Sequence, residues 1–246
     1  MAITTGAITT AYCYDGVSTL SIARPSGVVN GDVLLTIISK QNTTAPSCSG
    51  WVTISTASTT PGTNLSSRAA YKIITDIDSE PASYVWTLSN NYRTSASTIV
   101  LSGVDLDNPI DASAAATVGI NYASASHYAS SIDIATEGAL QVSCVFHSFY
   151  IAHLTEPYGT RWCSYRAATN YIYMASNFYT ASVGATGNVY WSGIASSAAE
   201  WHMYNFAFKP AAESGGYAND VFGVASANIG KVFGVETANI DKVFGA

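Results

Sequence analysis

The fold class is decided by the stretch Asn30-Gly31-Asp32-Val33-Leu34-Leu35-Thr36-Ile37-Ile38. An Asn-Gly pair suits the positive φ angles of a tight turn, and the residues after Asp32 are all aliphatic or β-branched, as in buried strands. Successive side chains of a strand point to opposite faces, so we expect Leu34, Thr36 and Ile38 to share one face. The stretch therefore predicts a tight turn followed by a core strand over residues 32–39.

The same pattern extends to about residue 210. Short apolar and β-branched runs alternate with Gly, Pro, Asn, Asp and Ser, without convincing helical periodicity. The pattern predicts an all-β fold, an antiparallel, jelly-roll-like β-sandwich with a short C-terminal repeat tail. The expected strands cover residues 8–14, 18–23, 32–39, 51–56, 68–75, 83–88, 97–102, 130–134, 139–146, 161–167, 170–176, 188–192 and 200–208.

The last expected strand is apolar on both faces. One face would carry Trp201, Met203, Asn205 and Ala207, and the other His202, Tyr204, Phe206 and Phe208. Such a strand needs cover on both sides, so we expect it at the centre of the sandwich, between the core and a further layer.

The end of the chain carries a short repeat. Val221-Phe222-Gly223 recurs as Val232-Phe233-Gly234 and Val243-Phe244-Gly245, at a spacing of eleven residues. One unit is too small to bury its own side chains, so it must stack on its neighbours or on another chain. Glycine and β-branched neighbours favour strand-and-turn units over a helix. The predicted organisation is a sandwich domain over 1–210, a linker over 211–217 and a repeat tail over 218–246. The tail would anchor or oligomerise the protein through Val221, Phe222, Ile229, Val232, Phe233, Ile240, Val243 and Phe244.

Composition excludes several kinds of partner. Only 11% of the residues are charged, against about 25% in typical soluble domains. The net charge is −6, and the ten Lys and Arg residues are scattered, which argues against nucleic acid as the main partner. The sequence has no run of eighteen apolar residues, and its first residues lack the basic start and apolar core of a secretory signal. We therefore expect a soluble protein without membrane insertion.

Motifs of the common enzyme classes are absent from the sequence. The chain has neither H-x-x-x-H nor H-E-x-x-H, no G-x-S-x-G and no glycine-rich phosphate loop. We therefore expect no catalytic residue and no cofactor. His147 and His153, with Glu156, form a weak candidate for a metal site, and the alternative is that they are exposed or hydrogen-bonded loop histidines.

Two acidic clusters are candidate sites. Asp105, Asp107 and Asp111 form a weak calcium candidate, and Asp76 and Asp78 with Glu80 follow an expected strand. Paired acids also hydrolyse glycosidic bonds, so either cluster would serve a glycosidase. The alternative is that these Asp residues cap turns through hydrogen bonds to their own backbone.

A further candidate surface is aromatic. Tyr171 and Tyr173 share one face of an expected strand, and Trp162 and Tyr165 lie on the preceding strand, which is expected to pair with it. Such a face could stack on sugar rings, fill a subunit interface or pack in the core. These four residues are therefore possible glycan or subunit contacts.

Several segments together resemble a β-sandwich module of bacteriophage virion proteins. They lie within residues 15–145 and are Pro25-Ser26-Gly27-Val28, Gly31-Asp32-Val33-Leu34-Leu35, Gly50-Trp51, Tyr84-Val85-Trp86, Ser102-Gly103-Val104-Asp105 and Pro109-Ile110-Asp111-Ala112. The tail is similar to short repeats in phage structural and tail-associated proteins. The resemblance implies that the Gly-Asp turn starts a core strand, that Trp51 packs at a corner, and that the Gly-Val-Asp segment closes a sheet edge.

The residues and the resemblance together predict a non-enzymatic structural protein of the virion, a capsid decoration or fibre subunit made soluble in the host cytoplasm. The sandwich would be displayed, and the repeats would hold it to other virion proteins or to copies of itself, with a trimer implied by the resemblance. The alternative is a glycan-binding host-adhesion module that contacts a host surface glycan. An enzyme is a third class, and it would need one of the acidic clusters as its catalytic pair.

Overall fold

The computed structural model describes residues 1–13, 17–59, 65–89, 93–121, 127–148, 151–155, 160–166, 173–195, 199–212, 231–232 and 235–236. The chain divides into two compact units, one formed by Ala2–Pro210 and the other by Met1 together with Ala211–Ala246. We call the first unit the body. In the second unit, the described strands β19 (Lys231–Val232) and β20 (Val235–Glu236) pair antiparallel.

The first half of the body is built on a five-stranded sheet in the order β1-β7-β3-β5-β4. Its strands are β1 (Thr4–Cys13), β3 (Val33–Gln41), β4 (Val52–Ser58), β5 (Leu65–Ile73) and β7 (Thr94–Ser102). A second layer, formed by β2 (Thr19–Ala23) and β6 (Ser83–Thr87), packs on one face of this sheet, and a 3₁₀ turn, η1 (Ile77–Ser79), precedes β6. The apolar residues between the two layers include Leu20, Ile22, Leu34, Tyr84 and Trp86.

The second half is built on a six-stranded sheet in the order β14-β15-β12-β18-β8, in which β9 also pairs with β18. Its strands are β8 (Ile110–Ser113), β9 (Thr117–Asn121), β12 (Ala139–His147), β14 (Thr160–Arg166), β15 (Tyr173–Ala181) and β18 (Ala199–Phe208). Its outer layer has the order β10-β17-β13, with β10 (His127–Ala129), β13 (Ile151–Thr155) and β17 (Val189–Ala195), and a separate pair of β11 (Asp133–Ile134) and β16 (Gly184–Ala185).

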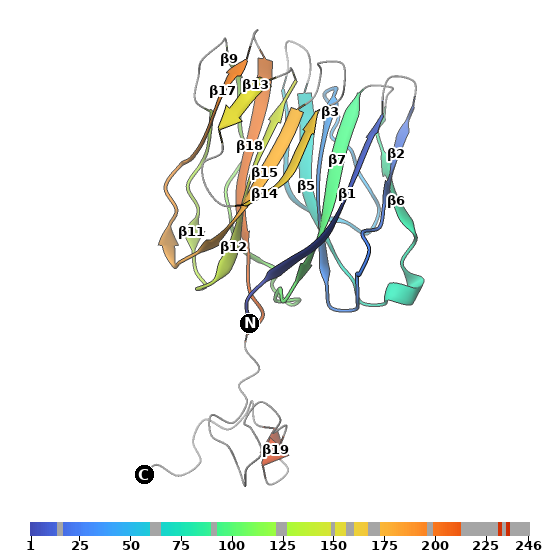
Figure 1. Ribbon diagram of the computed structural model, residues 1–246, viewed down its shortest axis with the longest axis vertical. Helices are drawn as coiled ribbons and strands as arrows, with labels where there is room; N and C mark the ends of the chain where they lie inside the picture. The colour runs from blue at the N-terminus through green and yellow to red at the C-terminus, as the bar shows by residue number, and fades with distance from the viewer. Residues whose placement is uncertain are drawn as a thin grey trace. The chain divides into compact units, whose positions relative to one another are not determined.

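These sheets form the layers of a sandwich (Figure 1). The pair of β2 and β6 lies on the right in that view, the two large sheets follow side by side, and β11 and β17 lie on the left. In the first half, β1 pairs with β7 and β2 pairs with β6, so that the first strand meets the last and the second meets the next to last, as in a jelly roll. The prediction of an all-β, antiparallel, jelly-roll-like sandwich is confirmed.

The predicted turn and core strand at residues 30–39 are confirmed. Gly31 has a φ of +91°, a value that glycine adopts without steric strain. The buried carboxylate of Asp32 accepts hydrogen bonds from Val29 N at 2.8 Å and from Ser102 Oγ at 2.6 Å. Strand β3 is buried on both faces from Val33 to Lys40, because β2 and β6 cover one face and the second large sheet covers the other.

The central position predicted for residues 200–208 is also confirmed. Strand β18 lies between β12 and the pair of β8 and β9. Tyr204, Phe206 and Phe208 pack in the cluster between the two large sheets, while Trp201 and Met203 pack against the outer layer.

Other expectations are wrong in detail. Strands β8, β9, β10, β13 and β16 lie where none was expected. Gly103-Val104-Asp105 does not close a sheet edge, because it continues from β7, which lies between β1 and β3, and Val104 bridges to Pro210 instead. Trp51 packs against the core of the first half, with its ring centre 5.2 Å from that of Tyr84.

The two halves of the body repeat one topology. The order β1-β7-β3-β5-β4 of the first half matches the order of β8 and β9, β18, β12, β15 and β14 in the second, and the pair of β2 and β6 matches β10 and β17. The register also matches. Val33 lies opposite Leu101 and Ile73, and Leu140 lies opposite Phe208 and Thr180. Each of these three residues in the second half follows its counterpart in the first half by the same number of positions. We call the two halves the first and second repeat.

The irregularities of the two repeats coincide as well. The outermost strand of each large sheet carries a bulge at the same place, at Thr53 and Ser55 opposite Ala70 and Ala69, and at Arg161 and Cys163 opposite Asn177 and Ser176. Bulges are specific features of a fold rather than defects, so a shared bulge supports a common architecture. The body is therefore a tandem pair of jelly-roll-like repeats.

The repeats pack against each other through their large sheets. Equivalent residues of both repeats meet in one hydrophobic cluster, including Val33, Leu35, Ile99 and Leu101 of the first repeat and Leu140, Val142, Phe206 and Phe208 of the second. The contacts are reciprocal, since β4 touches β18 and the equivalent strand β14 touches β7. This is the arrangement of an isologous dimer interface, formed within one chain.

Candidate functional site

Most of the predicted tail and aromatic contacts lie outside the described residues. Of the eight tail positions, Val232 lies in β19, and the other seven fall outside the described ranges. Trp162 and Tyr165 lie on β14 and Tyr173 begins β15, so the expected pairing of these strands is confirmed, although their side chains and the whole of Tyr171 lie outside the description. Their roles as anchor, subunit or glycan contacts stay predictions.

Two of the three acids of the calcium candidate, Asp105 and Asp111, have carboxylates held in separate contacts. Asp105 Oδ1 accepts hydrogen bonds from Asp107 N at 3.0 Å and Asn108 N at 3.1 Å, while its Oδ2 lies 2.8 Å from Lys209 Nζ. The hydrogen bond from Lys209 is the main reason that the pKa of Asp105 lies below its usual value. Asp111 Oδ2 instead accepts a hydrogen bond from Ala135 N at 2.8 Å. Within the described ranges, no group of three or more His, Cys, Asp or Glu side chains is placed to hold a metal ion.

The second acidic cluster is also structural. Asp76 caps the turn η1 by accepting a hydrogen bond from Asp78 N at 3.2 Å. Glu80 Oε1 lies 3.1 Å from Lys72 Nζ, and Glu80 Oε2 accepts a hydrogen bond from Tyr84 Oη at 3.0 Å. Asp76 therefore caps a turn, as the turn-capping alternative predicts, whereas Glu80 binds two side chains of the first half of the body.

Three histidines gather at one end of the second repeat. His127 on β10 stacks on Trp201 with ring centres 4.8 Å apart and an interplanar angle of 11°, and its ring centre lies 4.7 Å from that of His147. The end of β12 is tied to the start of β18 by hydrogen bonds from Glu200 N to Ser148 Oγ and from Ser148 N to Glu200 O, both at 2.9 Å. We call His127, His147, His202 and Trp201 the histidine cluster.

The position of His147 differs from the prediction. We expected an exposed or hydrogen-bonded loop residue, but His147 is the last residue of β12 and is fully buried, and neither ring nitrogen has a hydrogen-bond partner in the described structure. The strand continues one residue beyond its predicted end, because His147 pairs with Trp201 on β18 and Tyr173 on β15. His153 lies on β13, but its side chain is outside the description.

His202 points between the two repeats. Its Nδ1 lies 2.7 Å from Ser67 Oγ on β5, and the same Ser67 Oγ lies 2.5 Å from Tyr204 Oη. These three fully buried side chains form a polar contact across the interface of the repeats.

Burial lowers the pKa of every histidine in the cluster. The pKa of His127 falls to about 4 and that of His202 to about 3, because the charged ring would lose its hydration. Burial also holds the pKa of His147 well below its ordinary value, and the nearby His127 and His202 lower it further. All three rings are therefore neutral at pH 7.

The distance between Ser67 and His202 is that of a catalytic nucleophile and its base, but their environment does not suit catalysis. A catalytic base needs a pKa near the working pH and a path for the substrate, whereas His202 has a pKa of about 3 and both residues are fully buried. The chemistry that the cluster supports is uptake of protons in acid, rather than proton transfer to a substrate at neutral pH.

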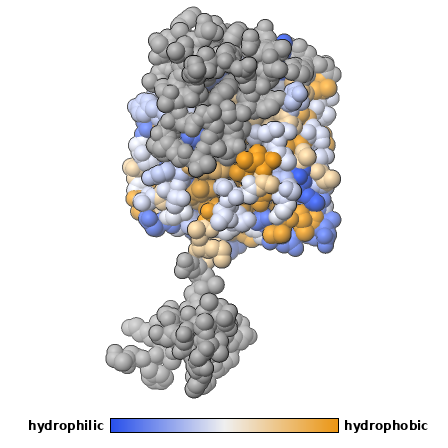
Figure 2. Space-filling model, viewed as in Figure 1, coloured by the Kyte–Doolittle hydropathy of each residue, from blue (hydrophilic) through white to orange (hydrophobic). Residues whose placement is uncertain are grey.

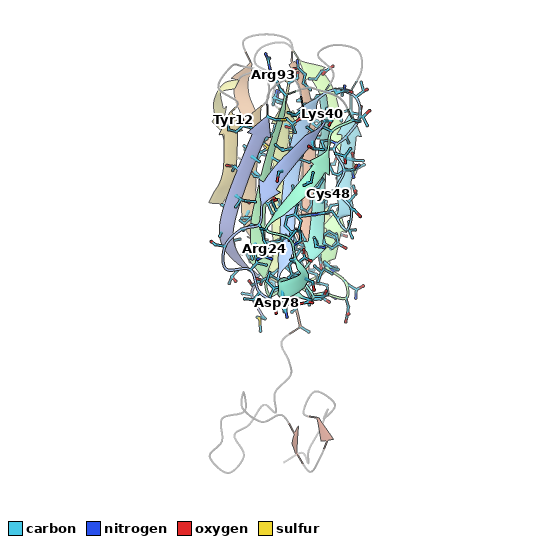
Figure 3. The ribbon with its side chains drawn as sticks, turned by 90° about the vertical axis from the view of Figure 1, so that its right-hand side faces the viewer. Tyr12, Arg24, Lys40, Cys48, Asp78 and Arg93 are labelled. Carbon is cyan, nitrogen blue, oxygen red and sulfur yellow. The ribbon has the colours of Figure 1, made fainter. Side chains whose placement is uncertain are left out.

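The first repeat places different residues at the equivalent end. Lys40 takes the position of His147, and it is also fully buried, with no hydrogen-bond partner for its Nζ among the described atoms. Burial lowers the pKa of Lys40. Figure 3 shows Lys40 and Arg93 together at one end of the repeat, and Arg24 and Asp78 at the other.

The rest of the surface is weakly polar. On the part of the body that is coloured in Figure 2, hydrophobic residues are interspersed with pale, weakly hydrophilic ones. The large exposed apolar residues come from different segments and include Val29, Val85, Val183 and Tyr190. None of the helices in the described ranges is long and apolar enough to cross a membrane.

Comparison of the chain with protein-family models, with curated proteins and with solved structures gave no match.

Proposed function

We propose that this chain is a non-enzymatic structural protein of a bacteriophage particle, a capsid decoration or fibre subunit. The body would be displayed, and the repeat tail would hold it on the particle. The observation that carries the proposal is the repeated Val-Phe-Gly pattern within a unit separate from the body, Ala211–Ala246. Short repeats of this kind cannot bury their apolar side chains alone, so they need a partner chain or a further copy.

The body supports the same proposal in two ways. Asp105 and Asp111, which were candidates for catalysis, are engaged in structural hydrogen bonds and an ion pair, and the Ser67–His202 contact is fully buried. Jelly rolls also occur in viral capsid and lectin domains, although this is an analogy of fold and does not by itself assign a function.

The direct test is incorporation into particles. The full chain, a chain that lacks residues 211–246, and a full chain with Phe222, Phe233 and Phe244 all changed to Ser would each be produced during particle assembly. Their occupancy would be measured by quantitative mass spectrometry and electron microscopy of purified particles. A matched control changes the exposed Val29, Val52 and Val85 of the body to Ser.

We expect full occupancy for the natural chain and for the control, and loss of occupancy for both tail variants. Equal occupancy of the truncated chain would refute the anchoring role of the tail. Absence of the full chain from the particles would refute the structural role itself.

A further inference from the structure

The outer face of the second repeat carries an open pocket beside β15. Its volume is about 470 Å³, and its walls are formed by Gln141, Tyr179, Ala181, Ser182, Val183, Ala185 and Thr186. Small-molecule sites have volumes of about 300–1,000 Å³, so the pocket is large enough for one or two sugar rings. None of these seven residues carries a charge.

The walls of the pocket are fixed by hydrogen bonds. On one side, β16 pairs with β11, with Ala185 opposite Asp133. The next residue, Thr186, is bonded twice to Ile132: Thr186 N donates to Ile132 O at 2.9 Å, and Ile132 N donates to Thr186 Oγ1 at 3.1 Å. The turn before β16 is held by Val183 N, which donates to Glu137 Oε2 at 3.2 Å. A ligand would therefore meet a preformed wall, which lowers the entropic cost of binding.

The chemistry of the walls suits a sugar. Tyr179 is 46% exposed and offers an aromatic ring, while Ser182 offers a hydroxyl group; the Thr186 hydroxyl is held in the wall, because it accepts from Ile132 N and donates to Gly187 O at 2.9 Å. Beneath them, Gln141 Nε2 donates to Asn205 Oδ1 at 2.8 Å, whereas Gln141 Oε1 has no donor among the described protein atoms. Aromatic rings stack on the apolar face of a sugar, and amides and hydroxyls exchange hydrogen bonds with its hydroxyl groups.

The equivalent place in the first repeat carries different residues. Leu34 lies opposite Lys72 as Gln141 lies opposite Tyr179, so these pairs occupy equivalent positions. In the first repeat, Leu34 is covered by the apolar cluster that includes Tyr84 and Trp51, and Lys72 is paired with Glu80. The second repeat therefore exchanges a buried leucine and a paired lysine for an amide and an exposed tyrosine.

We propose that this pocket binds a neutral carbohydrate. Tyr179 would stack on one sugar ring, and Ser182 and Gln141 would contact its hydroxyl groups. A neutral ligand fits walls without charge, since a charged ligand would lose its hydration there without gaining a partner of opposite charge. The inference concerns the body alone and does not rest on the proposed role in the particle.

The test is binding of defined sugars to the full chain. Glucose, galactose, mannose, N-acetylglucosamine and their common disaccharides, with N-acetylneuraminic acid as a charged comparison, would each be supplied at up to about 10 mM, and binding would be followed by saturation-transfer NMR and calorimetry. Two variants alter the pocket: Tyr179→Ala removes the ring, and Ala185→Leu fills space at an exposed position. The matched control is Tyr190→Ala, which removes a tyrosine that is 54% exposed and lies on β17 outside the pocket.

We expect at least one neutral sugar to bind, with affinity reduced about tenfold or more by both pocket variants and changed by less than about twofold by Tyr190→Ala. Thermal unfolding of each variant would show that the fold is kept. The proposal would be overturned if no neutral sugar bound, or if only the charged sugar bound. It would also be overturned if Tyr190→Ala lowered the affinity and Tyr179→Ala did not.

Discussion

Acidification should destabilise the body well above the pH at which carboxylates usually titrate. The perturbation acts on the histidine cluster, whose three rings are buried and neutral in the folded state. In the unfolded chain each histidine has its ordinary pKa of 6.5. Because the folded pKa is the lower one, the unfolded chain takes up protons first. The stability is therefore complete above pH 6.5 and is lost as the pH falls toward the folded pKa.

The size of the loss follows from these pKa values. Between pH 6 and pH 5 the unfolded chain binds up to three more protons than the folded chain, which gives a slope approaching 4 kcal/mol per pH unit. At pH 5 His127 and His202 have each removed about 2 kcal/mol from the free energy of unfolding, about 4 kcal/mol together, and His147 adds to this loss because burial lowers its pKa as well. A domain is typically stable by only about 5–15 kcal/mol, so a loss of this size brings the body close to unfolding.

The assay is urea unfolding of the full chain from pH 7 to pH 5, followed by tryptophan fluorescence. The matched variant is His127→Leu, because the first repeat carries Leu20 at the equivalent place, paired with Trp86 as His127 is paired with Trp191. In this variant the unfolded chain should bind one proton fewer in excess of the folded chain. The slope of the free energy of unfolding against pH should therefore fall by about 1.4 kcal/mol per pH unit.

Two results would contradict this account. One is a free energy of unfolding that stays constant between pH 6.5 and pH 5. The other is a slope for His127→Leu equal to that of the natural chain, which would mean that His127 is not held neutral by burial.

Two further substitutions test the packing of the body by urea unfolding at pH 7. Gly119→Ala should cost about 1–3 kcal/mol, because its Cβ would lie 2.6 Å from the buried Trp201 ring, while Val118→Ala, at the exposed neighbouring residue, should change stability by less than about 1 kcal/mol. Leu35→Ala should lower the free energy of unfolding by about 2–5 kcal/mol, because Leu35 is fully buried between the repeats. Val85→Ala, on the surface, should lower it by less than about 1 kcal/mol. Equal losses for the two variants would show that packing between the repeats does not stabilise the body.

Local sequence patterns predicted most of the strands. The Asn30-Gly31 pair and the aliphatic run after it placed β3, and the two apolar faces of residues 201–208 placed β18 at the centre. Both signals are strong because the strands are buried on both faces, which demands apolar residues at nearly every position. Strands β8 and β9 were missed because residues 112–117, where one ends and the other begins, are all Ala, Ser or Thr, which give no contrast between two faces.

The duplication of the body was not visible in the sequence. Residues 30–41 and 137–148 fold into equivalent strands, yet Gly31 and Gly138 are the only identical pair between them. Both glycines have positive φ at the turn before the strand, so backbone geometry preserves this residue, while any apolar side chain of suitable size serves in the core.

The histidine cluster was also missed, because its members are distant in sequence and form no spaced motif. One signal was present: His202 lies inside a strand predicted to be covered on both faces, and a histidine there must be buried. The pocket could not be predicted, since it depends on the short pair of β11 and β16 and on the replacement of Leu34 by Gln141 in the second repeat.

The reciprocal packing of the repeats bears on how the protein can change over time. Two identical subunits must accept every substitution twice, once on each side of their symmetry axis. Here the partners are joined in one chain, so a change in one leaves the other untouched, and neither must find its partner by diffusion. The first repeat can therefore keep Leu34 buried in an apolar cluster while the second carries Gln141 and the exposed Tyr179 at the equivalent positions, so each outer face can change without the other.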